Sequence, residues 1–290
     1  MVRPAFDPDA WFHGTPEPLA GLQEAKMKAI VMAGGTPSPD DPLYPYTQGR
    51  PKALLDIAGK PMLQWVLDAL NASQAVDGLL VYGVNPQMYP WRVTKPVTWR
   101  SDRGSMVKNI LAGLEELSHD EPEDAWVLLV SGDVPTITGE ILDWAAENVR
   151  HFPTVDVVYH VVERRVMEQR FPGVRRTYLR LRDVEVCGGD VNLARVRVGK
   201  RDDDLWDRLY AARKSPLRQA ALVGWGTLLK ILLRRLTLAE AVAEVSQRLR
   251  LPGIAVLSPY AELAMDVDKP EHVEIVRREL SQRQGEDTSV

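Results

Sequence analysis

The chain has 290 residues, 45% of them hydrophobic and 26% charged, which is enough apolar material for one large domain or two small ones. A formal net charge of −4 argues against the globally basic surface of a nucleic-acid-binding protein. A single cysteine, Cys187, excludes a disulfide within the chain and argues against a cysteine-based zinc site.

Neither end of the sequence nor its interior predicts a membrane segment. The first residues, MVRPAFDPDAWFHG, lack the apolar core of a signal peptide. The longest weakly polar stretch, 220–233, is interrupted by Gly224, Gly226 and Lys230. We therefore expect a cytoplasmic protein without a transmembrane segment, which agrees with its cysteine content.

In the first half, strands and helices alternate. Residues 1–24 are expected to be a leader, and 36–50 a Pro- and Asp-rich loop. The expected strands are 28–32, 79–84 and 126–130, and the expected helices are one that begins at Pro61 and those at 106–117 and 141–149. The strands are near-continuous apolar runs, a pattern typical of a mostly parallel sheet with both faces covered. The sequence thus predicts an α/β fold whose site lies beyond the carboxyl ends of the strands.

Beyond residue 150 the pattern changes. We expect strands at 155–162, 177–181, 192–198, 254–257 and 264–268. Between them lies a helical insert, 202–250, in which Thr237 and Glu240 have the spacing of a capping box. A last helix is expected from Pro270 to about Leu280, followed by a disordered tail, 281–290.

A glycine pair follows the first strand. Gly34 and Gly35 would let the backbone approach a phosphate chain and point N–H groups at it. Lys52, further along, would add a positive charge where negative charge develops on the α-phosphate. Taken separately, the glycines could form an ordinary strand-to-helix turn, and Lys52 could be a solvated lysine.

Taken together, the segments AIVMAGG and RPKALLDIAGKPMLQWVLDAL are diagnostic. They resemble the signature of the nucleotidyltransferases with a GT-A-type fold, which include sugar-phosphate nucleotidyltransferases, molybdenum cofactor guanylyltransferase and methylerythritol-phosphate cytidylyltransferases. The resemblance implies a Rossmann-like three-layer sandwich with a helical insertion in its second half. It assigns 25–150 to a nucleotide-binding half and 151–280, with the insert 202–250, to an acceptor-binding half. The expected nucleotide-binding residues here are Ala33, Gly34, Gly35, Thr36 and Lys52.

The phosphate loop departs from that signature. The family loop usually runs G-x-G-T-R-M, whereas residues 34–39 read GGTPSP. Arg50 could replace the missing arginine, the loop could close only on substrate, or catalysis could be impaired. We favour the first alternative, in which Arg50 and Lys52 are the catalytic cations.

Three aspartates are expected to bind magnesium. Asp133 ends a strand in the context SGDVP, and the resemblance makes it a metal ligand; an isolated aspartate there could instead cap a helix. Asp266 and Asp268 would share one face of an extended strand, and the family's late D-x-D segment makes Asp268 the second ligand and Asp266 its neighbour. Alternatively, Asp268 caps the helix that begins at Pro270.

Two further segments match less specifically. Gly104 and Ser105 precede a helix at the position where the family contacts the nucleobase, although Ser105 could be a simple helix cap. Gly189, Asp190 and Asn192 resemble the segment that shapes the acceptor side, although a plain hairpin turn would look the same.

The implied activity is magnesium-dependent transfer of a nucleoside monophosphate from an NTP to a phosphorylated small-molecule acceptor, with release of pyrophosphate. One rival is a GT-A glycosyltransferase, which would not need Gly34 and Gly35 paired with Lys52. Another is a non-catalytic nucleotide-binding module, favoured by the missing loop arginine. The basic insert 202–250 could bind an anionic acceptor, a partner chain or a membrane surface, or simply pack. The base, the acceptor and any homo-oligomer stay open.

Overall fold

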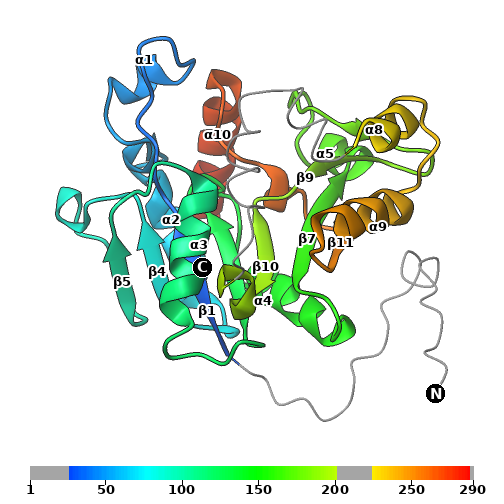
Figure 1. Ribbon diagram of the computed structural model, residues 1–290. Helices are drawn as coiled ribbons and strands as arrows, with labels where there is room; N and C mark the ends of the chain where they lie inside the picture. The colour runs from blue at the N-terminus through cyan, green and yellow to red at the C-terminus, as the bar shows by residue number, and fades with distance from the viewer. Residues whose placement is uncertain (1–25, 201–223, 288–290) are drawn as a thin grey trace.

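The computed structural model describes residues 26–200 and 224–287, with side chains as far as 285 (Figure 1). The expected leader 1–24, the first part of the insert, 202–223, and residues 288–290 lie outside the described residues. Figure 1 shows a central sheet with helices packed on it.

Nine of the described strands form one sheet in the order β5-β4-β1-β6-β10-β7-β9-β8, with β11 paired to β7. β5, β4, β1 and β6 run parallel, as do β7 and β11, whereas β10 lies antiparallel between β6 and β7. A short ribbon, β2 (Asp56–Ile57) with β3 (Lys60–Pro61), stands apart. The strands of the main sheet are β1 (Met27–Met32), β4 (Val76–Tyr82), β5 (Val97–Arg100), β6 (Trp126–Ser131), β7 (Val157–Glu163), β8 (Leu179–Arg180), β9 (Glu185–Gly188), β10 (Val191–Arg195) and β11 (Gly253–Ser258).

Alternate residues of β1 supply two separate cores, which makes the fold three-layered. Ala29 and Val31 pack in the core that includes residues of α2 (Met62–Ala72) and α4 (Gly139–Glu147). Ile30 and Met32 pack in the opposite core with residues of α3 (Met106–Leu117). The expected α/β, mostly parallel architecture is confirmed.

The second half adds three helices around β7 and β11: α5 (Arg164–Arg170), α8 (Trp225–Leu232) and α9 (Leu238–Leu249). The expected capping box is confirmed, because Thr237 N donates to Glu240 Oε2 at 2.8 Å and Glu240 N donates to Thr237 Oγ1 at 3.2 Å. In the described ranges, no helix has both the length and the apolar character needed to cross a membrane.

Several expected boundaries are wrong. The strand expected at 264–268 is instead a 3₁₀ turn, η6 (Ala261–Ala264), followed by irregular backbone. β10 ends at Arg195 and continues as the 3₁₀ turn η5 (Val196–Lys200). The loop 36–50 contains a short helix, α1 (Tyr44–Thr47). The last helix, α10 (Pro270–Asp287), extends into the expected disordered tail because Arg283 donates to Thr136 O and pairs with Glu279.

Gly113 has no side chain and so allows α3 to lie close to β1. A Cβ at this position would lie 2.6 Å from Cδ1 of Ile30, which is completely buried. We expect Gly113→Ala to lower the free energy of unfolding by about 1–3 kcal/mol, because a packed core does not accommodate an extra methyl group. Urea denaturation measures this directly.

The matched control is Gly226→Ala in α8, where a Cβ would meet no atom of the described residues within 4 Å. There we expect no loss of stability, and a gain of up to about 1 kcal/mol from helix propensity. Equal unfolding free energies for the two variants would contradict the packing described for Gly113.

Candidate active site

A cavity opens at the carboxyl ends of β1 and β6. Its volume is about 280 Å³, close to the lower end of small-molecule sites, roughly 300–1,000 Å³. The lining residues that the sequence predicted are Ala33, Gly34, Gly35, Lys52, Gly104, Ser105 and Asp133. The structure therefore brings the glycine loop, the lysine, the β6 aspartate and the segment before α3 to one cavity.

The glycine loop needs its glycines for two different reasons. Gly35 has a φ of +109°, a backbone conformation that side chains disfavour, and its carbonyl accepts a 3.0 Å hydrogen bond from Lys52 N. At Gly34 a Cβ would lie 2.8 Å from Oδ2 of Asp102, so the absence of a side chain lets Asp102 approach. This loop thus places the backbone of Lys52 beside the carboxyl end of β1.

Lys52 joins the two aspartates expected to be metal ligands. Its Nζ lies 2.7 Å from Oδ2 of Asp133 and 2.6 Å from Oδ1 of Asp268. Burial acts to lower the pKa of Lys52, but the charges and hydrogen bonds of the two carboxylates outweigh burial and raise it. Burial acts in the opposite sense on Asp268, whose pKa is nevertheless lowered by Lys52, Arg176 and His272.

Asp133 is held in position by its own strand end and by the late segment of the chain. Ser131 Oγ donates to Asp133 Oδ1 at 2.6 Å, and the Asp133 carbonyl accepts from Val267 N at 2.9 Å. The second bond ties the residue before Asp268 to the end of β6. The two carboxylates are therefore neighbours through the backbone as well as through Lys52.

The donor chemistry at Asp133 and Asp268 fits magnesium. Mg²⁺ prefers carboxylate oxygens and usually takes one or two from the protein, completing its shell with phosphate oxygens and water. In the ranges that the structure describes, no group of three or more His, Cys, Asp or Glu side chains is arranged to hold a metal. A magnesium site here would thus consist of these two carboxylates together with the nucleotide.

Asp266 does not take the position expected beside Asp268. It is buried, and its carboxylate contacts the guanidinium of Arg176. Side chains at i and i+2 share a face only where the backbone is extended. Met265, with φ −102° and ψ 56°, is not in an extended conformation. Nδ1 of His272 lies 2.9 Å from the Asp266 carbonyl and 3.4 Å from Asp268 N, so the imidazole contacts the backbone between the two side chains.

Arg50 and Thr36 also lie elsewhere. Neither lines the cavity, and both are exposed. The Arg50 Nε donates to the carbonyl of Thr47 at 3.4 Å, inside its own loop. In this structure Lys52 is the cationic side chain among the described lining residues, so the expected replacement of the loop arginine by Arg50 is not seen.

Of the three residues expected on the acceptor side, Asp190 is the one beside the carboxylate pair. Gly189 N donates to His160 O, and the Asn192 side chain bonds His160 N and Gly189 O, so these two residues build the β9–β10 turn. Burial and the neighbouring charge of Asp133 raise the pKa of Asp190 from 3.8 to about 7. Their contact with an acceptor stays a prediction.

Sequence reasoning missed three polar residues that line the cavity, Asp102, Asn109 and Ser131. Asp102 Oδ1 accepts from Gly104 N at 2.9 Å and from Asn109 Nδ2 at 3.0 Å. Asn109 is 2% exposed. The sequence feature that could have indicated it is a polar amide on the buried face of an amphipathic helix. Ser105 caps α3 by accepting from Lys108 N at 3.2 Å, so the capping alternative for it is confirmed, although it also lines the cavity.

A family described as the MobA-like NTP transferase domain matches residues 29–248. The chain belongs to this family. A solved structure described as a hypothetical transferase from Thermus thermophilus is 35% identical, with a TM-score of 0.72, over 86% of this chain and 99% of that one. These matches confirm the expected superfamily and the nucleotidyltransferase class.

More distant relatives carry more specific names. A ribitol-5-phosphate cytidylyltransferase of Streptococcus agalactiae is 26% identical over 113 residues, which is 36% of this chain and 46% of that enzyme. The match thus spans about half the length of that relative. A CMP:2-keto-3-deoxy-manno-octonic acid synthetase complexed with CTP has a TM-score of 0.52 at 18% identity, over 89% of this chain and 99% of that one. At that identity the likeness concerns the fold.

The raised pKa of Asp190 predicts how the free energy of unfolding changes with pH. The folded chain keeps this proton up to about pH 7, whereas the unfolded chain releases it near 3.8, so this site destabilises the folded chain as pH rises between those values. Asp190→Asn removes that loss, and the variant should gain stability over the wild type across this window.

Urea denaturation at a series of pH values, without divalent cations, tests this expectation, with Asp120→Asn at an exposed position as the control. A stability difference between Asp190→Asn and wild type that stays constant with pH would contradict the burial described for Asp190.

Proposed function

We propose that this chain transfers a nucleoside monophosphate from an NTP to a phosphorylated sugar or polyol and releases pyrophosphate. The carrying observation is that Lys52, Asp133 and Asp268 meet at the edge of the cavity that the glycine loop lines. Such a cluster of one cation and two carboxylates beside a glycine loop suits a triphosphate with a divalent cation. The names of the cytidylyltransferase relatives make CTP the first candidate nucleotide.

In the proposed reaction, an oxygen of the acceptor's phosphate attacks the α-phosphorus of the NTP. The new bond joins that oxygen to the α-phosphorus, and the bond to the bridging oxygen of the β-phosphate breaks, so that pyrophosphate leaves. No covalent intermediate with the protein is required, and the protein contributes positioning and charge stabilisation.

Each part of the site has a task in this scheme. The backbone of Gly34 and Gly35 would follow the phosphate chain, and Lys52 would exchange a carboxylate partner for a phosphate oxygen. Asp133 and Asp268 would hold magnesium, which supplies charge neutralisation on the phosphates when bound. The lining groups before α3, among them Asn109, would contact the nucleoside.

A pyrophosphate-release screen of the four common NTPs against phosphorylated sugars and polyols tests the proposal. We expect turnover with magnesium, most strongly with CTP, and its loss when the metal is chelated. Asp133→Ala should abolish turnover with an unchanged fold, because it removes a carboxylate from the proposed metal site.

The matched control is Asp120→Ala, which removes an exposed carboxylate outside the cavity and should retain wild-type turnover. Full turnover in Asp133→Ala would overturn the metal assignment. Stabilisation of the chain by a UDP-sugar with manganese, but not by any NTP with magnesium, would favour a glycosyltransferase instead.

A further inference from the structure

Arg176 is a largely buried cation to which the proposed reaction gives no task. It lies in the segment between α5 and β8, with 13% of its side chain exposed, and its guanidinium contacts the carboxylate of Asp266. A guanidinium has five N–H donors, and one carboxylate accepts at most a pair of them in the parallel arrangement. Arg176 also hydrogen-bonds the Cys187 thiol, and these two partners still leave donors of the guanidinium for a further anion.

The Arg176 segment is attached to the segment that carries Asp268. Lys269 Nζ donates to the Arg175 carbonyl at 3.1 Å, and Asp266, the partner of Arg176, precedes Asp268 by two residues. The positive charge of Arg176 contributes to the lowered pKa of Asp268 and opposes the raised pKa of Asp190. Arg176, Asp190 and Asp268 do not line the glycine-loop cavity. The charge of Arg176 therefore acts on the two aspartates from outside that cavity.

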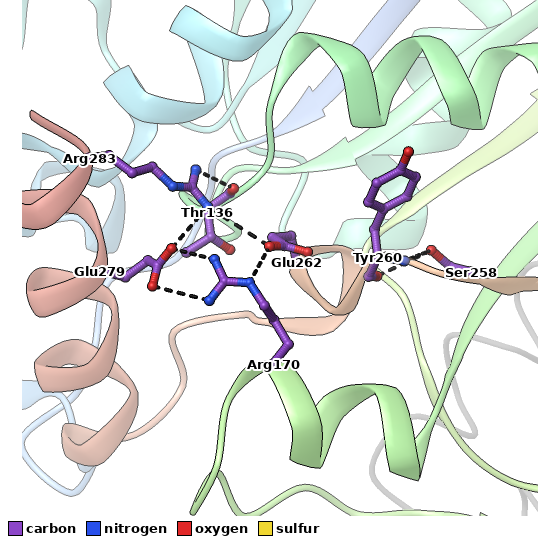
Figure 2. Close-up of polar contacts among 7 residues, drawn as sticks. All are labelled: Thr136, Arg170, Ser258, Tyr260, Glu262, Glu279 and Arg283. Atoms are coloured by element: carbon purple, nitrogen blue, oxygen red, sulfur yellow. Dashed lines mark hydrogen bonds and ion pairs between the residues drawn. The ribbon is translucent and has the colours of Figure 1, made fainter. Parts of the chain in front are cut away.

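A network of ion pairs fixes where this segment begins. Arg170, the last residue of α5, donates from Nε to Oε1 of Glu262 at 2.8 Å and also pairs with Glu279 of α10 (Figure 2). Arg283 pairs with Glu279 at 3.4 Å and donates to the carbonyl of Thr136, close behind Asp133. The network joins α5 to η6, which precedes Asp266, and to α10, which follows Asp268. The segments that carry Arg176 and Asp266 are therefore anchored to the same ion pairs.

A tyrosine hydroxyl lies beside Gly188, two residues before Asp190. Tyr159 on β7 is 44% exposed, and its Oη lies only 2.2 Å from where a Cβ of Gly188 would be. Gly188 thus leaves room for the phenol next to the turn that carries Asp190. The charge of Arg176 reaches Tyr159 as well, since it opposes the rise in the pKa of the phenol caused by burial and by Asp190.

We propose that the guanidinium of Arg176, oriented by Asp266, and the hydroxyl of Tyr159 bind the phosphate monoester of the acceptor. This assignment rests on the proposed function, because in-line displacement requires the acceptor on the opposite side of the α-phosphorus from the departing pyrophosphate. A dianion that approaches Asp133, Asp190 and Asp268 needs a cation there, and a guanidinium suits the geometry of phosphate oxygens.

The first test compares Arg176→Gln with Arg175→Gln, which removes the same charge from the exposed neighbouring position. Steady-state kinetics should show an acceptor KM raised roughly tenfold to a hundredfold in Arg176→Gln, as expected for loss of a charged hydrogen bond, with the NTP KM unchanged. Arg175→Gln should keep both values. Equal acceptor KM values in the two variants, or an equal rise in the NTP KM, would overturn the assignment.

Arg176→Lys guards against a simple folding defect, because it keeps the charge but not the planar donor pair. Its acceptor KM should lie between those of the wild type and Arg176→Gln. Wild-type values for this variant and for Arg176→Gln alike would overturn the proposal.

A binding measurement separates this proposal from the activity itself. Inorganic phosphate is titrated calorimetrically into the wild type, Arg175→Gln and Arg176→Gln without nucleotide, and only Arg176→Gln should lose about tenfold or more in affinity. If the wild type turns over no pair of NTP and acceptor, the proposed function fails, while a loss confined to Arg176→Gln still supports an anion site at Arg176. Equal phosphate affinity in all three proteins would overturn that site.

Discussion

The ammonium group of Lys52 holds together two carboxylates that lie far apart in the sequence. Asp133 follows β6 and Asp268 precedes α10, yet both are within 2.7 Å of the same Nζ. Two carboxylates this close to a common point repel each other unless a cation lies between them. The lysine fills that role here, and the same charge arrangement would accept magnesium and a triphosphate. The charges of both carboxylates also contribute to the raised pKa of Asp190, and Lys52 opposes that rise.

Much of this arrangement is predictable from sequence, because it follows from the topology of a parallel sheet. Buried strands are continuous apolar runs, and their carboxyl ends meet at one edge, so Gly34 after β1 and Asp133 after β6 had to be neighbours. The resemblance to a known signature added Lys52 and Asp268, whose proximity no local pattern indicates. The family match confirms the superfamily, and Lys52 lines the cavity, with Asp268 paired to it from outside the lining.

The errors share a physical cause, which is that side-chain direction depends on backbone geometry that the sequence does not show. Asp266 and Asp268 were expected on one face of a strand, but residues 265–268 are irregular, and Asp266 contacts Arg176 whereas Asp268 contacts Lys52. Arg50 was expected in the phosphate loop by elimination, whereas its Nε bonds its own loop. Asn109 was overlooked because its role depends on a hydrogen bond to Asp102, which the helix sequence by itself does not indicate.

The central claim is that one triphosphate site is formed by Lys52, Asp133 and Asp268. A crystal structure with a non-hydrolysable CTP analogue and manganese tests it most directly, because the anomalous signal of the metal locates it independently of the protein. We expect one metal peak bonded to the Asp133 and Asp268 carboxylates and to the phosphates, with Lys52 Nζ on a phosphate oxygen. Nucleotide bound elsewhere, or a metal without contact to either carboxylate, would contradict the account.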